Sequence, residues 1–598
     1  MMVQNSDVRN LYKIFFITIL GLGLFYPSIF AGTLPIDDQQ LLHHLLNVKT
    51  INWHRIFLRN GHGYYYRPLL YTSFLLDEIF MGSHPVWMHF VNILLHTING
   101  VLVFNITKSF LKIFPINCSK EKQLIPFLSS ILFLCNPIVT ESVNWISGRS
   151  DLLSGTFALL SLFILLEKGQ STLFILVSGL FFFLSMLSKE VGFALFPVVL
   201  LFLYLTRISQ KQFTNWRPLT TILTYIGFII FYVMMRFGGG RHAPKLVTHV
   251  KKAMISGGTL NVFDILLPKL KIFVVAYGFY MKKLLYPLPL NFAIVSINMN
   301  LYEVFGILSI LGTLLIFYLL LKKQQFILFF AVFSILFFIP ALPVALYQIA
   351  WTPLAERYLY LSSVGFAVIL SYLLCQIKRK YIVPYLIKDA AIIFLFVLAC
   401  VVTYNRNLCW QSSLSLYKDT IKKSPSFAPI RNDYAIVLKR HGYTKEALAQ
   451  FQIAKTLCRG KQSRIENNLL LAKTTSLNAN IVAAKLASLY DSTKSKKIKQ
   501  EILNNLLRAL GMSMETRPLS DSQRENLIKT MIHYNAEGYR LFRDPFYLYR
   551  QGQLFLMLGE KEKAKVFFHQ VCSESSDFFT SAACKLDQKL SKELASNE

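Results

Sequence analysis

Long apolar runs fill the first two thirds of the sequence and constrain its fold more than any other feature. A helix needs about 20 mostly apolar residues to cross the hydrocarbon core of a membrane. Hydrophobic residues make up 54% of the chain, which contains 50 Phe. The sequence therefore predicts an all-α, polytopic membrane bundle of about eleven spans. The predicted spans are 11–30, 86–107, 125–140, 151–167, 171–187, 190–206, 219–236, 301–321, 325–343, 358–377 and 388–404.

The first run must be distinguished from a cleavable signal peptide. It follows Arg9 and Lys13, and Ala31-Gly32 offers small residues at its end. A signal peptide, however, has a shorter apolar core of about 7 to 15 residues. We therefore expect 11–30 to be an uncleaved first span.

The segment 262–287 is apolar but interrupted by charge. Lys269 and Lys271 lie near its start and Lys282 and Lys283 near its end. The uncharged stretch between them, about ten residues long, is too short to span a membrane. The sequence predicts an interfacial or re-entrant helix here.

Basic residues predict the topology, because cytoplasmic loops carry an excess of Lys and Arg. With eleven spans and the N-terminus inside, every short basic loop falls on the inner side of the membrane. A twelfth span at 262–287 would move the last two basic clusters to the outer side. The C-terminal domain is then expected outside. The inside loops carry Lys108, Lys112, Lys120, Lys122, Lys168, Arg207, Lys211, Arg217, Lys322, Lys323, Lys378, Arg379, Lys380 and Lys388; the outer loops are 31–85, 136–150, 237–300 and 344–357.

The net charge of +31 raises the possibility of a nucleic-acid partner. The Lys and Arg are spread over short loops and the tail, so topology and anionic lipid headgroups explain them better, and no nucleic acid is expected. The eight Cys include no CxxC pair, which argues against a zinc site or a disulfide scaffold.

The polar C-terminal part has the spacing of tetratricopeptide repeats, so we divide the chain into a membrane domain, 1–407, and a repeat domain, 408–598. Small or apolar residues recur at fixed offsets of a 34-residue helix-turn-helix unit. Two segments show the pattern, and 467–490 resembles a degenerate third copy, whereas 510–525 is expected to be a loop. The two sets are Ala435, Gly442, Ala447, Phe451 and Ala454, then Gly552, Gly559, Ala564 and Phe568.

Such arrays usually present a concave surface to a peptide or protein. A structural cap or an oligomer contact is the alternative for this domain. Cys572 and Cys584 are able to form a disulfide if this side of the membrane is oxidising.

A run of polar side chains continues from a loop into an apolar helix. Arg67 precedes the span 86–107, which carries His89, Asn92, His96 and Asn99. The last three share one helix face by their spacing. Polar groups at membrane depth usually face a bundle interior or a watery cavity. They are either interhelical hydrogen-bonding residues or the support of a catalytic loop above the bundle.

Asp37-Asp38 directly follows the first span. Adjacent carboxylates at a membrane surface supply a general base or bind a divalent cation, which is the only cofactor that the sequence suggests. The alternative is that an Asp caps the following helix.

Further charged residues lie in the predicted outer loops: Glu141, Arg149 and Asp151; Lys189-Glu190; and Glu356-Arg357. Arg and Lys that converge at a membrane surface suit a lipid-linked phosphate. A helix cap for Asp151 and a salt bridge between Glu356 and Arg357 are the alternatives. The chain has no P-loop, GxSxG or HExxH motif.

These segments, in order, resemble a known family. They are Asp37-Asp38; Tyr66-Arg67-Pro68-Leu69; Gly82, Pro85, His89, Asn92 and Leu95-His96; Asn136-Pro137 with Thr140-Glu141; Gly148-Arg149 with Asp151-Leu152-Leu153; Ser188-Lys189-Glu190; Leu285 and Pro287; and Ala355-Glu356-Arg357-Tyr358-Leu359-Tyr360. The chain resembles the transmembrane-and-tetratricopeptide O-mannosyltransferases of the GT-C glycosyltransferase superfamily. It departs from them at Asn136, where the family usually has His, and in its few repeats.

The resemblance implies transfer of a mannose-like sugar from a polyprenyl-phosphate donor to a hydroxyl acceptor at the outer face. It implies an Asp of the 37–38 pair, with Glu141, as catalytic residues, and Arg67, Arg149, Lys189 and Arg357 as ligands of the donor phosphate. His89, Asn92, His96, Asp151, Glu190 and Glu356 would support these groups.

The repeats favour a protein Ser/Thr acceptor over a glycolipid or polysaccharide. A non-enzymatic scaffold or a transporter is the other class, although we find no related halves among the spans, which a transporter would show. We expect a multi-pass protein of a bacterial inner membrane with periplasmic repeats, or of the endoplasmic reticulum with lumenal repeats.

Overall fold

The fold is helical throughout the part of the chain that the structure describes. This computed structural model describes residues 2–34, 38, 56–57, 66–82, 84–116, 123–208, 217–237, 262–295, 297–320, 324–347, 350, 352–376, 385–458, 463–474, 478–516, 519–574 and 579–595. Apart from an isolated bridge between Ile294 and Leu354, these residues form helices and their connections. The chain divides into two compact units, Met1–Pro425 and Ser426–Glu598. The predicted all-α fold is confirmed.

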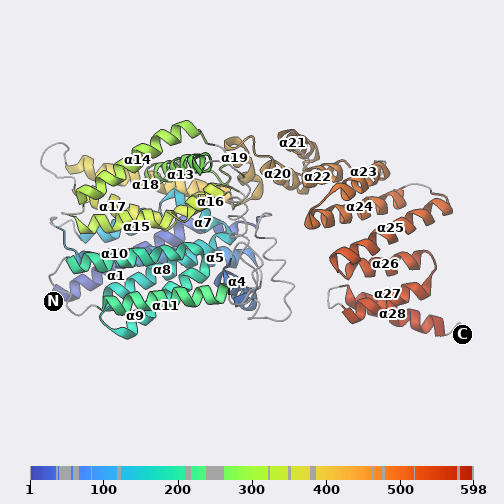
Figure 1. Cartoon of the computed structure of the whole chain (residues 1–598), viewed down its shortest axis with the longest axis horizontal. Helices are drawn as coiled ribbons and strands as arrows, with labels where there is room; N and C mark the ends of the chain where they lie inside the picture. Colours follow the sequence, from blue (N-terminus) through green and yellow to red (C-terminus); the bar gives the residue numbers. More distant parts are fainter. Residues whose placement is uncertain are drawn as a thin grey trace. The chain divides into compact units, whose positions relative to one another are not determined.

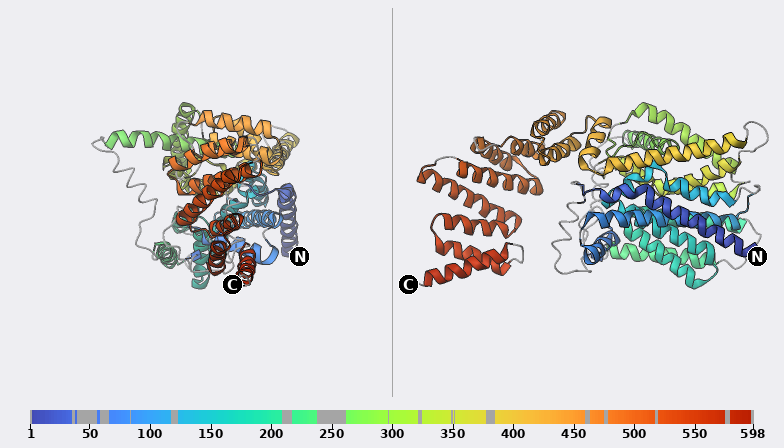
Figure 2. Two further views of the ribbon diagram at one scale, coloured as in Figure 1. Left: turned by 90° about the vertical axis from the view of Figure 1, so that its right-hand side faces the viewer. Right: turned by 180° about the vertical axis from the view of Figure 1, so that it is seen from behind.

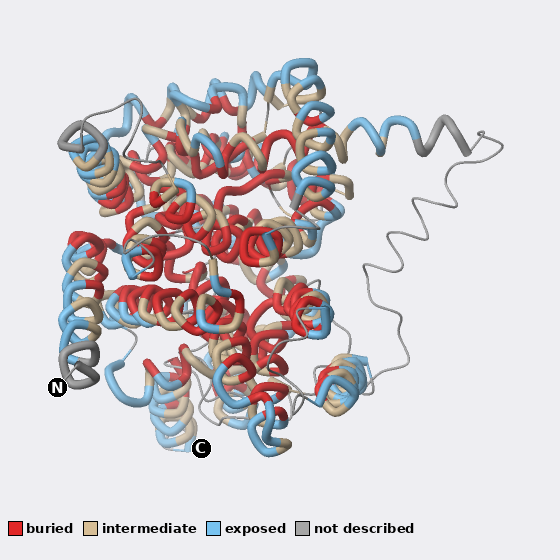
Figure 3. Tube along the Cα trace, turned by 90° about the vertical axis from the view of Figure 1, so that its left-hand side faces the viewer, coloured by how far each residue is buried: buried red, intermediate tan, exposed pale blue. Residues whose placement is uncertain are grey.

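Unit 1 is a bundle in which most long helices run side by side (Figures 1 and 2). Buried residues gather inside it and exposed residues lie on its outward faces (Figure 3). The helices are α1 (Met2–Phe25), α4 (Pro68–Met81), α5 (Pro85–Ile113), α6 (Ile125–Leu134), α7 (Thr140–Asn144), α8 (Arg149–Lys168), α9 (Thr172–Ser188), α10 (Leu195–Ile208), α11 (Pro218–Phe237), α13 (Val262–Leu285), α14 (Met299–Leu320), α15 (Gln325–Phe338), α16 (Ala341–Tyr347), α17 (Ser362–Gln376), α18 (Tyr385–Trp410) and α19 (Ser413–Lys423).

Eight helices among the described residues are long and apolar enough to cross a membrane. The bent pair formed by α6 and the segment Pro137–Asn144 would make a ninth. The predicted spans 171–187 and 358–377 correspond to α9 and α17, which have 17 and 15 residues. By length and composition eight or nine of the eleven predicted spans qualify, and the other two, α9 and α17, are shorter apolar helices at the predicted positions.

One end of the bundle collects basic residues from different helices. Lys13 donates a hydrogen bond to the Gln123 carbonyl at 3.1 Å, and Lys112 pairs with Glu167 at 3.3 Å. At the start of α9, Arg217 donates to Thr172 at 2.5 Å. In Figure 1 the N-terminus marks this end, and α4, α7 and α16 lie at the opposite end. The predicted basic loop residues 120, 122, 211, 322–323 and 378–380 lie outside the described residues.

Helix α13 covers the segment predicted to be interfacial or re-entrant. It contains Pro268 and is not among the candidate spans. In Figure 2 it projects from the bundle across the direction of the long helices. It crosses α14 in close contact, since a Cβ on Gly278 would lie 2.7 Å from the Gly306 Cα atom. Whether α13 lies at a membrane interface remains a prediction.

Unit 2 is a row of antiparallel helix pairs, as the repeat spacing predicts. Ala435 and Ala447 are fully buried where α20 and α21 pack together. Gly442 and Gly559 occupy equivalent turns with φ of +85° and +78°, which favour glycine. The helices are α20 (Ala428–Arg440), α21 (Thr444–Leu457), α22 (Ser463–Lys473), α23 (Ala479–Ser492), α24 (Lys496–Thr516), α25 (Asp521–Phe542), α26 (Phe546–Met557), α27 (Lys561–Glu574) and α28 (Thr580–Ala595).

Two details of the tail differ from the sequence expectation. The segment 510–525 is not a loop, because α24 continues to Thr516 and α25 begins at Asp521. The expected domain boundary at 407 falls inside α18, whose Arg406 pairs with Asp419 of α19 at 2.6 Å. This pair links α18 to α19, and unit 1 extends to Pro425.

Candidate active site

The candidate residues lie at the end of unit 1 opposite the basic loops, and each candidate cation has a carboxylate partner. Arg67 pairs with Glu190 at 3.0 Å and Lys189 with Asp151 at 2.5 Å. The ion pair between Arg357 and Glu141 is also buried. Sequence reasoning placed all six residues at the site but did not predict these pairings.

Arg67, Lys189 and Arg357 form a group that we call the three-cation cluster. They come from three elements: the segment before α4, the turn after α9, and the 3₁₀ turn Glu356–Leu359. Burial lowers the pKa of Lys189 to about 8, Asp151 opposes this effect, and the nearby charges of Arg67 and Arg357 lower it further. Three cations close enough to repel one another, each balanced by a carboxylate, are chemically suited to hold an anionic group.

The Glu141–Arg357 pair joins two loops that lie far apart in the sequence. Besides the ion pair, the Arg357 backbone N–H donates to the Glu141 carboxylate at 3.0 Å. The guanidinium lies over the rings of Trp145 and Tyr358, at 5.1 and 5.0 Å from their centres. These contacts fix the turn 356–359 against the loop 136–148 and orient Arg357.

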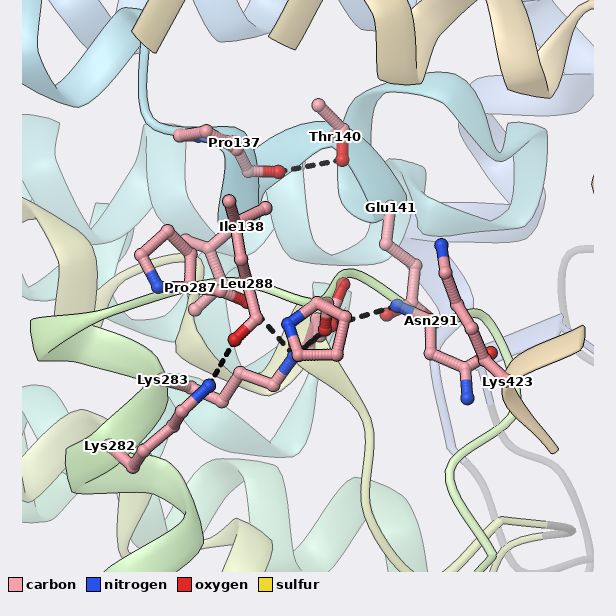
Figure 4. Close-up of polar contacts among 12 residues, drawn as sticks. Pro137, Ile138, Thr140, Glu141, Lys282, Lys283, Pro287, Leu288, Asn291 and Lys423 are labelled. Carbon is pink, nitrogen blue, oxygen red and sulfur yellow. Dashed lines mark hydrogen bonds and ion pairs between the residues drawn. The ribbon is translucent and has the colours of Figure 1, made fainter. Parts of the chain in front are cut away.

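Glu356 pairs with Lys283, and not with its sequence neighbour Arg357 as the alternative interpretation supposed. Lys283 Nζ lies 2.6 Å from Glu356 Oε1, which also accepts the Asn291 backbone N–H at 3.0 Å. Figure 4 shows Lys283 and Asn291 converging beneath the segment that carries Glu141. Burial raises the pKa of Glu356, while the charge of Lys283 lowers it. Adjacent residues of one turn are thus tied to two different segments.

Arg149 has a different environment from the three-cation cluster. Its side chain is fully buried and pairs with Asp77 at 2.6 Å. It donates to Asn92 Oδ1 and to the Met88 carbonyl, both at 2.9 Å, and lies over the Phe74 ring. Most of its N–H groups are therefore already used, so Arg149 is placed to hold α4, α5 and the start of α8 together rather than to bind a phosphate.

Of the acidic pair after the first span, Asp38 is described and Asp37 lies outside the described residues. Asp38 is buried, and its carboxylate accepts from the Ser147 hydroxyl at 2.7 Å and backbone N–H at 3.2 Å. Its second oxygen accepts from Leu34 N–H at 3.0 Å. Asp38 thereby connects the end of the first span to the loop that also carries Trp145, which lies against Arg357.

The polar face of α5 supports neighbouring elements. Asn92 donates to the Trp145 carbonyl at 3.0 Å as well as holding Arg149. His96 Nδ1 and Asn99 Nδ2 both lie 2.9 Å from the Tyr360 hydroxyl. His89 is buried beside the backbone of residues 31 and 32. Both interpretations of this face therefore apply, since Asn92 supports a site loop while His96 and Asn99 connect helices.

Asp77, Lys283 and Tyr360 were missing from the residues selected by sequence. Asp77 belongs to the polar segment that runs from Arg67 into the span 86–107, and Lys283 was noted as a charge at the end of 262–287, but neither was given a role at the site. Tyr360 was part of a matched motif and also received no role. No group of three His, Cys, Asp or Glu side chains in the described ranges is arranged to hold a metal ion.

Comparisons with known proteins find relatives that are named protein O-mannosyl-transferases. A Caenorhabditis elegans protein named protein O-mannosyl-transferase F38B6.6 is 26% identical over 463 residues, which are 74% of this chain and 62% of that protein. Human protein O-mannosyl-transferase TMTC1 is 25% identical over 471 residues, 71% of this chain and 51% of its own. This chain is a relative of the transmembrane-and-tetratricopeptide O-mannosyltransferases. The resemblance seen in the sequence is confirmed.

Another relative matches a shorter stretch of the chain at higher sequence identity. Protein O-mannosyl-transferase tmtc2 of Xenopus laevis is 35% identical over 153 residues, which cover 24% of this chain and 17% of that protein. The chain spans 62% and 51% of the length of the first two relatives. No family model and no solved structure matches the chain. These three relatives come from animals, so the expectation of a bacterial membrane is not supported.

Proposed function

We propose that this chain is a membrane glycosyltransferase that moves a mannose-like sugar from a polyprenyl-phosphate donor to a Ser or Thr hydroxyl of a protein acceptor. The transfer takes place at the end of the bundle that carries the three-cation cluster, on the non-cytoplasmic side, with the endoplasmic reticulum as the membrane. The observation that carries the proposal is the convergence of Arg67, Lys189 and Arg357 in a chain related to O-mannosyltransferases.

In this proposal the three-cation cluster holds the donor phosphate. A phosphate offers acceptor oxygens to several charged donors at once, and Arg binds it in bidentate geometry. The partner carboxylates Glu190, Asp151 and Glu141 keep the cations in place and balance their charge in the absence of donor. Arg149 is left out of the donor ligands, because its N–H groups serve the packing of α4, α5 and α8.

The acidic pair Asp37-Asp38 supplies the base that removes the proton from the acceptor hydroxyl. A general base must lie within hydrogen-bond reach of that proton, directly or through a water. Asp38 already accepts two hydrogen bonds from Ser147 and one from Leu34. Glu141 acts by orienting Arg357.

The repeats capture the acceptor polypeptide. They follow the last span in the same chain, so a bound polypeptide is tethered to the transferase and its effective concentration at the site rises. Deleting 428–598 is expected to spare transfer to a small soluble hydroxyl acceptor and to reduce transfer to a protein strongly. Equal transfer to protein by the truncated and full-length chains would assign the repeats to assembly or stability.

The test of the whole proposal is a donor comparison with the purified full-length chain in lipid. Polyprenyl-phosphate mannose should support transfer to a Ser/Thr protein, whereas nucleotide-linked mannose should not. Asp38→Asn should lower turnover roughly 100- to 10,000-fold, the range for a lost general base. Transfer from the nucleotide sugar, or turnover by Asp38→Asn close to that of the parent chain, would refute the assigned donor or base respectively.

A further inference from the structure

A cavity on unit 2 lies across three successive helix pairs and has no role in the site described above. Its volume is about 460 Å³, and it is open to solvent. Asn432 and Asp433 of α20 form one wall, Arg464 of α22 the next, and Thr493 and Lys494, directly before α24, the third. We call it the repeat groove. It lies among the first helices of three consecutive repeats, the elements that usually form the concave surface of such an array.

Two asparagine pairs connect those same helices, and of their four members Asn432 lines the groove itself. Asn468 of α22 donates to the Asn432 side-chain oxygen at 2.9 Å, and Asn505 of α24 donates to that of Asn467 at 3.1 Å. Asn432 and Asn467 are buried, whereas Asn468 and Asn505 are half-buried. An asparagine amide donates hydrogen bonds through its NH₂ group and accepts them through its oxygen, so it is able to pair with both the C=O and the N–H of a peptide group. The carbonyl oxygens of Asn468 and Asn505 accept no hydrogen bond from the described residues.

Two of the three charged side chains that line the groove, Arg464 and Lys494, are positive, and the third is Asp433. Lys494 is exposed and has no ion-pair partner in the described part of the chain, and Lys496 beside it is also exposed. Arg464 is half-exposed and shares its charge with Glu501 at 3.4 Å. Burial raises the pKa of Asp433, the carboxyl group on the opposite wall, while its hydrogen bond with Asn432 and the charge of nearby Arg464 lower it. Lys494, the exposed cation of the groove with no ion-pair partner among the described residues, therefore favours a ligand that carries negative charge.

We propose that the repeat groove binds an extended segment of the acceptor polypeptide that carries acidic side chains. The asparagine amides pair with the peptide backbone, and Lys494 with Arg464 attracts the acidic side chains. An extended segment is required because a helix has already used its own backbone N–H and C=O groups. The proposal rests on the proposed function, since it names the part of the acceptor that the repeats hold.

The test uses the full-length chain in lipid and fluorescent Ser/Thr peptides of equal length that contain Glu, Gln or Lys at the same positions. The parent chain should bind the Glu peptide at least about tenfold more tightly than the Lys peptide, in a salt-sensitive manner. Lys494→Glu should weaken binding of the Glu peptide about tenfold and leave the Gln peptide within twofold. The double variant Asn468→Ala, Asn505→Ala should weaken Glu and Gln peptides alike.

Matched controls lie away from the groove. Lys485→Glu on α23 makes the same charge change at an exposed position, and Asn526→Ala on α25 removes an exposed amide. Both should bind every peptide within twofold of the parent chain. Equal affinity for Glu and Lys peptides, or equal losses in Lys494→Glu and Lys485→Glu, would overturn the proposal.

Transfer assays separate this inference from the proposed function. If the groove captures acceptor, Lys494→Glu should reduce mannose transfer to the Glu peptide but not to a small soluble hydroxyl acceptor. Normal transfer to every peptide by both groove variants would reject the groove and leave the transferase assignment intact. Absence of donor turnover with any acceptor would reject the transferase assignment, while the peptide affinities would still decide whether the groove binds acidic segments.

Discussion

Arg67→Ala provides the sharpest test of the three-cation cluster, because Arg67 is its most accessible member. The Arg67 side chain is 19% exposed and Glu190, its partner, is 31% exposed. Ion pairs that contact solvent contribute about 0 to 1 kcal/mol to stability. Removing this guanidinium should therefore change the thermal midpoint of the purified chain by only a few degrees.

The expected effect on donor binding is larger. A hydrogen bond to a charged group contributes about 1.5 to 3 kcal/mol. If Arg67 holds the donor phosphate, its loss should raise the KM for the lipid-linked donor about 10- to 150-fold. The KM for the peptide acceptor should stay within about twofold. Arg67→Lys should restore part of the affinity, because Lys keeps the charge but lacks the bidentate fork.

The assay is a donor titration at saturating acceptor, combined with thermal unfolding in the same detergent. Glu190→Gln serves as the matched control, since it breaks the same ion pair while keeping the cation. It should leave donor affinity equal to or higher than that of the parent chain. An unchanged KM for donor in Arg67→Ala, or the same loss in Glu190→Gln, would show that Arg67 is structural and would remove it from the donor site.

Four further predictions follow from the described contacts. Arg149→Met should lower the free energy of unfolding by about 3 to 5 kcal/mol, because it leaves buried Asp77 without its partner. Adding Asp77→Asn should recover part of the loss, as measured by thermal unfolding. Donor affinity should fall as pH rises through about 8, where Lys189 loses its proton, and Lys189→Arg should abolish this fall. The free energy of unfolding should instead rise between pH of about 8 and 10.5, because the unfolded chain binds more protons than the folded chain there. Cys572 and Cys584, joined in the structure with Cα atoms 5.6 Å apart, should resist thiol alkylation in intact cells until a reductant is added if unit 2 is outside the cytoplasm. A reporter fused after Glu598 should likewise respond as a lumenal protein, and a cytosolic response would refute the predicted orientation.

The sequence predicted the bundle and the repeats well because both depend on periodic patterns. Apolar runs locate helices whether or not their neighbours are known, and the spacing of Ala435, Gly442 and Ala447 follows directly from how two helices pack in a repeat. Boundaries were less accurate: 510–525 lacked a strong apolar period, yet α24 and α25 continue into it from both sides. With 17 and 15 residues, α9 and α17 lie near the lower limit of length for a membrane-spanning helix.

The ion pairs of the site could not be predicted from the sequence, because they join residues far apart along the chain. Glu356 and Arg357 are adjacent, so a local salt bridge between them was the simplest interpretation. In the 3₁₀ turn they occupy, neighbouring side chains point in different directions, and each meets a partner from a distant segment: Lys283 for Glu356, and Glu141 for Arg357. The pairing of Asp77 was not predicted either, because its partner Arg149 lies 72 positions further along the chain.

These pairings also bear on how an anionic donor would enter. Unpaired cations buried at a membrane surface would carry a large desolvation cost, so each carboxylate partner stabilises the site before the donor arrives. A phosphate then competes with a carboxylate that is already in place. Competition is easiest at Arg67, whose ion pair contacts solvent. It is hardest at Arg357, whose guanidinium lies over the rings of Trp145 and Tyr358 and is held by Glu141. The donor phosphate is therefore expected to meet Arg67 first, with Lys189 and Arg357 completing the contacts from fixed positions.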